Sequence, residues 1–536
     1  MTQTNQESEK EKKKPSQVIV DAFKELGETL VAFVKAPRAL WGINLPYILE
    51  GLVYFGILTI LGKYCSENIG LTDPQAGWVY SAVTGGITFA MLLFGGVSDK
   101  IGVRRSLALA FGIMMIGRIF ISLSGTLPLG TGITSTSFFV MSFGLLLMVS
   151  AYGLYQPAAY AGVKRYTNPQ TAAMGYAVIY ALMNLGAFIF GPISSFTRHH
   201  FESVFPPNGL TAVFWVLVGI TFLSLVLTLI ILTKRVDKRA VERVAIETKN
   251  LRMKNGETPE PEEEKKTEKP TSPKIDNKPF FIYLSLGILS LILTLLVLVK
   301  AIRFPEGVAF TLLTIFAILS FWEFIRKRPD HPFRDTRFVA FIFILIPVQT
   351  LFAHNWLTIP YYLDRAFAGT WVGDHFEILS NLNPIIIFVV TPIIAGLTAR
   401  ANVYRMMILG TFVMAAPTFI LVAGPHTILF VLYIIIMSVG EAMWQPRFLQ
   451  WIAEIAPEGK TGAYMGIGQF PWFLTKVITG LYSGYFVSAY LPLPESGLPT
   501  RSGHMWLIYG IIAMVSPIVL LFVKKWMVKG MKGKSA

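Results

Sequence analysis

Apolar residues run through this sequence in stretches of about 20, separated by short polar connections. A helix needs about that length to cross the roughly 30 Å of bilayer hydrocarbon, so each stretch predicts a membrane-spanning helix. Fourteen spans are expected, near 43–63, 76–98, 103–124, 135–157, 171–195, 211–233, 279–300, 307–325, 337–358, 378–398, 404–423, 427–446, 463–488 and 505–524. The pattern therefore predicts an all-α membrane protein.

Two polar regions interrupt this pattern. Residues 18–35 carry apolar side chains at helical spacing, which predicts an amphipathic helix on the membrane surface or, alternatively, a helix packed on loops. Residues 234–278 are rich in Lys, Glu, Pro and Thr and too poor in large apolar groups to bury a core, so they predict a charged linker. The helix before this linker could continue from Val236 to Leu251.

Six spans, then two, then six suggest two related bundles with an inserted hairpin between them. The expected division is a tail with an interfacial helix (1–40), a first bundle (41–233), the linker (234–278), the hairpin (279–328) and a second bundle with a basic tail (329–536). Carriers built from paired halves place the substrate site near the membrane midplane between them.

The formal net charge of +15 bears on orientation. Lys and Arg gather in the connections on one side, which predicts cytoplasmic N- and C-termini in a multi-pass protein of a bacterial inner membrane. The hairpin fits this rule least well, because Lys300 and Arg303 fall outside. The basic residues do not gather on a soluble face with aromatic residues, which argues against nucleic acid as a partner.

Composition excludes several chemistries. The single cysteine, Cys65, rules out an internal disulfide and a cysteine-based metal cluster. The chain lacks G-x-x-x-x-G-K-[ST], H-E-x-x-H and G-x-S-x-G, so we expect neither nucleotide hydrolysis nor another enzymatic activity. We expect no metal or cofactor, a proton gradient as the energy source, and a monomer.

The loop between the second and third spans carries a motif. Gly95, Asp99, Gly102, Arg104 and Arg105 stand in a segment that resembles G-x-L-A-D-R-x-G-R-K of the major facilitator superfamily. The glycines permit a tight turn, and the aspartate can pair with arginines or with a helix end. The resemblance implies the major facilitator fold, with this loop acting as a cytoplasmic gate.

Other segments resemble the proton-coupled oligopeptide transporters, whose bacterial members insert two helices where the hairpin falls here. The matches include Glu50 to Gly56, Gly153 to Pro157, Tyr180, Asn184, Gly186, Asn383, Pro384, Gly440, Glu441 and Pro446. The family motif ExxERFxYYG keeps one glutamate, Glu50, while its arginine is replaced by Gly51 and the family's lysine on helix 4 by Gln156. The resemblance thus implies a divergent member with its own substrate.

Five ionisable residues fall inside predicted spans: Glu50, Arg118, His354, Glu441 and Lys476. Such residues are costly in hydrocarbon and usually face a cavity or a partner. We expect Glu50 and Glu441 to bind protons in a central cavity, with His354 as a candidate relay. Lys476 and Arg118 are candidate partners for these acids or for an anionic substrate group, and buried pairs that only stabilise the fold are the alternative.

Further candidate contacts to a substrate are polar or aromatic residues of the expected inner helices. They are Tyr54, Tyr155, Gln156, Tyr180, Asn184, Gln349, Asn355, Asn383, Trp444 and Gln445. Pro347, Pro384, Pro392 and Pro471 are expected to bend their helices.

The sequence predicts a secondary active transporter that imports a small polar organic solute, peptide-like or another metabolite, together with protons. One alternative is an exporter of drugs or metabolites with the same fold. The other is a membrane receptor or scaffold that does not transport, with the linker as its working part.

Overall fold

The computed structural model describes residues 37–532 except 95–96, 169–170, 255–276, 299–301, 330, 399–400, 456–463, 465–466 and 469, together with residues 17, 20, 24 and 27. Almost all of the helix expected over 18–35 and residues 255–276 of the linker therefore lie outside the described residues. Within the described ranges the chain is helical and contains no strand.

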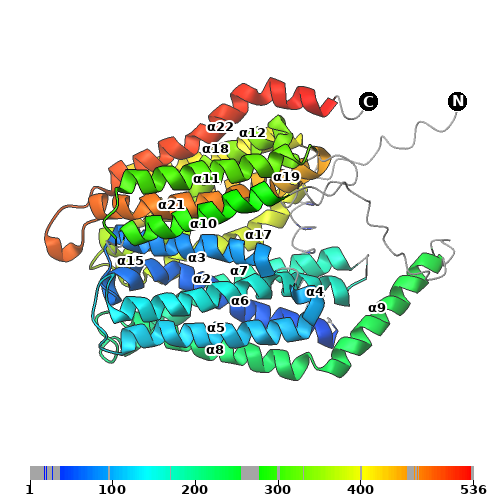
Figure 1. Cartoon of the computed structure of the whole chain (residues 1–536), viewed down its shortest axis with the longest axis horizontal. Coiled ribbons are helices and arrows are strands. Elements are labelled where there is room, and N and C mark those ends of the chain that lie inside the picture. The colour runs from blue at the N-terminus through cyan, green and yellow to red at the C-terminus, as the bar shows by residue number, and fades with distance from the viewer. Residues whose placement is uncertain are drawn as a thin grey trace.

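The first half of the chain forms a bundle of six long helices (Figure 1). They are α2 (Arg38–Lys63), α3 (Asp73–Phe94), α5 (Val103–Thr126), α6 (Thr136–Tyr166), α7 (Ala172–Phe201) and α8 (Leu210–Ile231), with a π turn, η1 (Tyr64–Asn68), and the short α4 (Val97–Ile101). The hydroxyl of Ser135 begins α6 by accepting the N–H of Phe138 at 3.1 Å.

Three helices connect the bundles: α9 (Lys234–Lys254), α10 (Lys278–Leu298) and α11 (Glu306–Arg326). The helix that the sequence allowed from Val236 to Leu251 is present as α9, but it does not continue α8, because the helix breaks at Leu232 and Thr233. In Figure 1 it leaves the bundle obliquely. Helices α10 and α11 pack on one another as a hairpin.

The second half forms another helical bundle. It contains η2 (Pro332–Arg334), α12 (Thr336–Ile344), α13 (Ile346–Leu357), α14 (Ile359–Ala366), α15 (Trp371–Asp374), α16 (Phe376–Ser380), α17 (Leu382–Leu397), α18 (Val403–Ala415), η3 (Ala416–Ala423), α19 (Thr427–Ile455), α21 (Phe470–Tyr490), η4 (Pro494–Ser496) and α22 (Ser502–Lys532). Asp335 caps α12 by accepting the N–H groups of Arg337 and Phe338.

Eleven helical segments of the described chain are long and apolar enough to cross a membrane. Helices α3, α10 and α21 occupy the other expected spans. The spans expected at 337–358 and 378–398 are each divided, at Leu345 and Asn381, close to Pro347 and Pro384. Proline lacks the N–H that an uninterrupted helix requires, which accounts for interruptions beside it.

Each bundle buries its own apolar core, and a smaller cluster joins them. In this cluster Phe55 and Tyr80 of the first bundle meet Trp356 and Leu357 of the second. Helix α3 packs on α21, and α7 packs on α16 and α17. The two bundles thus meet mainly through α3 with α21 and through α7 with α16 and α17.

The two ends of the molecule are distinct in Figure 1. Helix α9 and the end of α22 lie at one end, here called the linker end, and α15 lies at the opposite end, here called the α15 end. Helix α2 begins at the linker end, and the turn from α2 to α3 lies at the α15 end.

Candidate functional site

A cavity of about 540 Å³ lies between the two bundles. Its walls come from α2, α3, α6 and α7 of the first half and from α13, α17, α19 and α21 of the second. This volume suits a small organic ligand, and a position between domains is a frequent one for ligand sites.

Tyrosine side chains form much of the wall on the first bundle. Tyr47, Tyr54, Tyr80, Tyr152 and Tyr155 all border the cavity. Tyr47 and Tyr155 stack at 5.9 Å between ring centroids, and Tyr54 meets Tyr152 edge-on at 5.2 Å. Tyrosine offers an apolar ring and a polar hydroxyl. This wall can therefore pack against the body of an organic molecule and bind its polar groups.

Glu50 borders the same wall, but its charge is balanced inside the first bundle. Arg118 donates from Nη1 to Oε2 of Glu50 at 3.0 Å and from Nη2 to Oε1 at 2.5 Å. The hydroxyl of Tyr152 also donates to Oε1, and Arg118 contacts Thr221 Oγ1 at 2.5 Å. The exposed fraction of Glu50 is 2%, and that of Arg118 is 0%. This pairing, which the sequence left open, is a two-pronged buried salt bridge.

Glu441 borders the cavity from α19 in a different setting. Its Oε2 accepts a hydrogen bond from Asn383 Nδ2 at 3.0 Å, and Asn383 also donates to Ser438 Oγ at 2.9 Å. The ion pairs of the described residues include none to Glu441. Glu441 is thus a buried acid that a neutral amide orients and no described cation balances.

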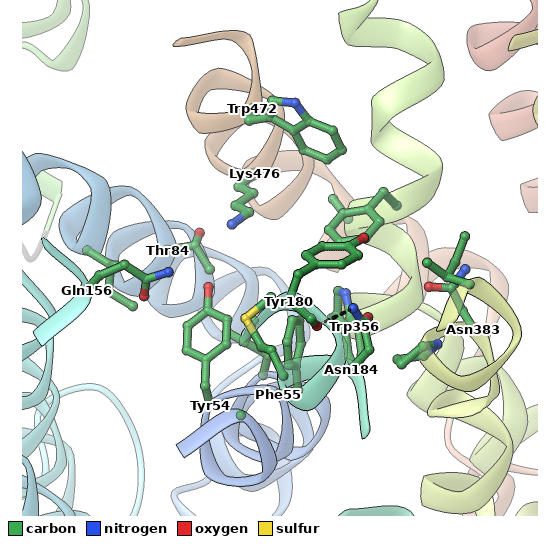
Figure 2. Close-up of a pocket in the computed structure, with 18 of the residues that line it drawn as sticks. Tyr54, Phe55, Thr84, Gln156, Tyr180, Asn184, Trp356, Asn383, Trp472 and Lys476 are labelled. Carbon is green, nitrogen blue, oxygen red and sulfur yellow. Dashed lines mark hydrogen bonds between the residues drawn. The ribbon is translucent and has the colours of Figure 1, made fainter. Parts of the chain in front are cut away.

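Lys476 of α21 is the cation among the described lining residues. It is half-buried, and its side chain extends into the space between the bundles (Figure 2). The pairing with Glu441, one of the two roles that the sequence allowed for Lys476, is not among the ion pairs of the described chain. An acid and a base therefore face this cavity without a described direct contact between them.

The cavity brings most of the expected residues together. Besides the two acids and Lys476, it is lined by Tyr54, Tyr155, Gln156, Tyr180, Asn184, Asn383 and Gln445. Figure 2 shows Tyr54, Gln156, Tyr180, Asn184, Asn383 and Lys476 gathered from different helices. Arg118, His354, Gln349, Asn355 and Trp444 are not among the lining residues.

His354, the expected relay, lies outside the cavity wall. Its Nδ1 contacts Thr358 Oγ1 at 2.7 Å, its Nε2 contacts the hydroxyl of Tyr482 at 3.0 Å, and its ring stacks on Tyr509 at 3.9 Å. The position of His354 on α13 turns the imidazole toward α21 and α22 instead of the first bundle. These contacts fit the packing role that histidines near helix ends often have.

Gln349 and Trp444 form a second layer behind the wall. Gln349 Oε1 accepts the hydroxyl of Thr475 at 3.1 Å, and Trp444 Nε1 donates to the sulfur of Met414 at 3.1 Å. The Trp444 ring stacks on that of Trp472, a lining residue, with an interplanar angle of 9°. Neither side chain is placed to contact a solute directly.

The loop motif is described in part. Gly95 lies outside the described residues, and so does the side chain of Asp99, whose backbone belongs to α4. Gly102 has a φ of +84°, a conformation that favours glycine, and α5 begins after it. Arg104 Nε donates to the carbonyl of Leu232 at 2.7 Å, and Arg105 is exposed. Arg104 thus ties the start of α5 to the end of α8.

Three ion pairs cross between the bundles at the α15 end. Lys63 pairs with Asp364. Arg365 donates to both carboxylate oxygens of Asp73, at 2.7 and 2.9 Å. These pairs connect the turn between α2 and α3 to α14.

The third pair joins α7 to α16. Arg198 Nε donates to Glu377 Oε1 at 2.7 Å, and the exposures of these side chains are 11% and 0%. Sequence reasoning missed all three pairs, since their charges stand at predicted helix ends and nothing in the sequence matches one half to the other.

The cavity lies on the linker side of these three ion pairs, because the lining residues of α2 run from Tyr47 to Leu58.

The chain matches a known family of membrane proteins. Residues 45–373 match the model of the Major Facilitator Superfamily. The chain belongs to this superfamily. This membership supports the class expected from the sequence, a secondary active transporter. In the described chain, no three His, Cys, Asp or Glu side chains group to hold a metal ion.

Within the superfamily, similarity extends over almost the full length to peptide transporters. The chain is 21% identical over 527 residues to dipeptide and tripeptide permease B of Xenorhabdus bovienii (strain SS-2004), covering 92% of this chain and 96% of the permease. It is similar in fold to a bacterial homologue of the human drug peptide transporters PepT1 and PepT2, with a TM-score of 0.62, 19% identity and coverage of 92% and 99%. It is also similar in fold to a POT family transporter in complex with 5-aminolevulinic acid, with a TM-score of 0.60 and 14% identity. This similarity covers 92% of this chain and 97% of that transporter.

Proposed function

We propose that the chain imports a small polar organic solute together with protons, and that the cavity between the bundles is the binding site. The observation that carries this proposal is the cavity itself, which contains an acid without a described cationic partner and lies next to an end closed by three ion pairs between the halves. Closing one end while a site remains inside is the geometry of alternating access.

Glu441 is the proposed proton site. A carboxylate inside a membrane protein is costly unless it is balanced, and binding a proton removes that cost. Glu50 is the second candidate, but Arg118 already balances its charge through two hydrogen bonds. We propose that Glu441 exchanges protons during transport and that Glu50 with Arg118 mainly holds α2 against α5. His354 is retained only as a packing residue.

The substrate class follows from the cavity and the relatives. Tyr54, Tyr180, Asn184, Asn383 and Gln156 are the proposed polar contacts. One similar protein is named as a dipeptide and tripeptide permease, and another was solved in complex with 5-aminolevulinic acid. We propose a peptide-like or similar small metabolite.

The remaining assignments complete this proposal. The linker end faces the cytoplasm, the α15 end faces outward, and the loop motif of Asp99, Gly102, Arg104 and Arg105 acts in gating. The protein has fourteen spans, divided at residues 41–233, 279–328 and 329–536, and works as a monomer in a bacterial inner membrane. It needs no cofactor, because the proton gradient supplies the energy.

Uptake into proteoliposomes tests the proposal. A mixed pool of peptides and small metabolites is offered with and without an inward proton gradient to the wild type and to Glu441→Gln, Glu50→Gln and, as a control on the exposed face of α9, Glu242→Gln. The proposal expects accumulation that depends on the gradient and is lost in Glu441→Gln but kept in Glu242→Gln.

The same experiment separates the alternatives. Extrusion that an opposite gradient drives would favour the exporter. If the folded wild type moves no compound in either direction, proton-coupled transport is overturned and the scaffold alternative gains. That alternative also required both acids to be sealed in salt bridges away from a cavity, whereas both acids border the cavity.

A further inference from the structure

The ionisable groups that line the cavity bear on the net charge of the substrate. Of the described ionisable acids and bases that line it, Glu50 is balanced by Arg118, which leaves Glu441 and Lys476. Both sit on the second bundle, on α19 and α21. The wall opposite them presents hydroxyl and amide groups, including those of Tyr54, Thr84 and Gln156.

We propose that Lys476 is an anion anchor and that the transported solute carries a net negative charge, in the simplest case one carboxylate on an apolar or aromatic body. This inference rests on the proposed function and names the substrate class of the same cavity. The anchor would lie on α21, and the tyrosine wall of the first bundle would hold the body of the solute.

The position of Lys476 supports such a contact. In Figure 2 its ammonium end points toward the side of the cavity that carries Tyr54, Thr84 and Gln156. Lysine offers three N–H donors and no acceptor, and charge-assisted bonds to a carboxylate are among the stronger hydrogen bonds. Tyr54 and Gln156 can donate to the same anion from the opposite bundle. A bound carboxylate would therefore link the two halves.

Charge balance gives the anchor a role in coupling. With the cavity empty, ionised Glu441 and Lys476 sum to zero. When Glu441 binds a proton, Lys476 is left as one uncompensated positive charge, which is costly inside a membrane. A monoanionic solute restores neutrality, and a cationic or neutral solute does not. The neutral states are thus the empty carrier and the carrier that holds both proton and anion, as symport requires.

A panel of four molecules on one skeleton tests the anchor. The probes are 3-phenylpropionate (anion), 3-phenylpropionamide (neutral), phenethylamine (cation) and phenylalanine (zwitterion). Binding to the purified full-length protein is measured by thermal stabilisation without any proton gradient. We expect 3-phenylpropionate to bind at least about tenfold more tightly than the other three, which corresponds to about 1.4 kcal/mol.

Variants assign that preference to one residue. Lys476→Gln should remove it, Lys476→Arg should keep most of it, and the control Lys249→Gln on the exposed side of α9 should bind like the wild type. The melting temperature of each variant without probe shows whether it is folded. If Lys476→Gln does not fold, two measurements still test the anchor. They are the preference of the wild type for the carboxylate over the amide, and the comparison of the wild type with Lys476→Arg.

Each remaining outcome has a defined meaning. A wild type without preference for the carboxylate over the amide, including one that binds neither, overturns the anion anchor. So does a Lys476→Gln variant that keeps the preference. Binding of the anion without gradient-driven uptake would overturn the proposed function and leave the anchor. Gradient-driven uptake of a neutral or cationic solute that Lys476→Gln does not affect would overturn the anchor and leave the proposed function.

Discussion

The guanidinium of Arg118 and the carboxylate of Glu50 meet through two hydrogen bonds, 3.0 and 2.5 Å long, at a point where both side chains are buried. Breaking such a pair on one side leaves an uncompensated buried charge, which typically costs about 3–5 kcal/mol. Replacing both partners by neutral groups costs much less.

The first prediction follows for this pair. Arg118→Met should lower the melting temperature strongly, because Glu50 then remains charged and unbalanced, and adding Glu50→Gln should recover a large part of the loss. Thermal unfolding of the purified variants measures both effects. If Glu50→Gln alone leaves stability unchanged but stops gradient-driven uptake, Glu50 is a proton site and its pairing with Arg118 is transient.

The second prediction concerns the α15 end. Glu377→Gln removes the carboxylate partner of Arg198 and should shift the protein toward conformations in which this end is open, by roughly 1–3 kcal/mol for a pair that is largely buried. Val204 and Ala368 are exposed residues of opposite halves. Spin labels at these two positions report the opening as a change in the distance between them, measured by pulsed electron paramagnetic resonance. Arg326→Gln disturbs an exposed pair on α11 and is the matched control.

An unchanged distance distribution in Glu377→Gln would show that this pair does not hold the α15 end closed. Combining Glu377→Arg with Arg198→Glu gives a further check. The exchanged pair should return the distribution toward that of the wild type, since the attraction is restored with opposite polarity.

The third prediction concerns the contact of α3 with α21. A Cβ at Gly480 would lie 2.1 Å from Ser81 Oγ, and one at Gly77 would lie 2.4 Å from the carbonyl of Gly480. Small residues allow membrane helices to pack this closely. Gly480→Ala should therefore separate the halves here and reduce transport several-fold. The control Gly219→Ala, where a Cβ meets no atom within 4 Å, should transport like the wild type.

Equal transport by the two glycine variants would mean that α3 and α21 tolerate a wider separation. Comparing their melting temperatures distinguishes lost movement from lost stability. A Gly480→Ala protein that melts like the wild type but transports slowly would place the defect in the movement of the halves.

The fourth prediction concerns α9. Asp237 accepts hydrogen bonds from the hydroxyl of Tyr166 at 2.8 Å and from Arg165 Nε at 3.2 Å, and Glu247 accepts one from Asn168 at 2.9 Å. Asp237→Ala removes two of these bonds, worth about 1 kcal/mol each. Amide hydrogen exchange over residues 234–254 should become faster. Glu242→Ala, which disturbs only an exposed pair with Lys238, should leave the exchange as it is.

Exchange that stays slow in Asp237→Ala would mean that apolar contacts hold the helix. Ala240 of α9 is buried and belongs to the core of the first bundle, so Ala240→Ser would then be the variant that accelerates exchange.

Much of the candidate site was predictable because polar groups are rare in membrane helices. Glu50, Glu441 and Lys476 stand out in any reading of the sequence, since each charge lies within an apolar stretch. All three border the cavity. His354 stood out for the same reason and lies elsewhere, because its contacts depend on the rotation of α13 about its axis, which a local pattern does not specify.

From the sequence alone, the membrane-spanning stretches and the costly charges within them were predictable, because hydrocarbon thickness sets helix length and a buried charge is costly wherever it occurs. The superfamily was indicated by the resemblance of the loop motif. Tertiary structure decided which charges meet. Arg118 balances Glu50, Arg198 reaches Glu377 across the halves, and Glu441 and Lys476 border the cavity without a described ion pair. These pairings join residues far apart in the chain, and only the packing of one bundle against the other brings them within bonding distance.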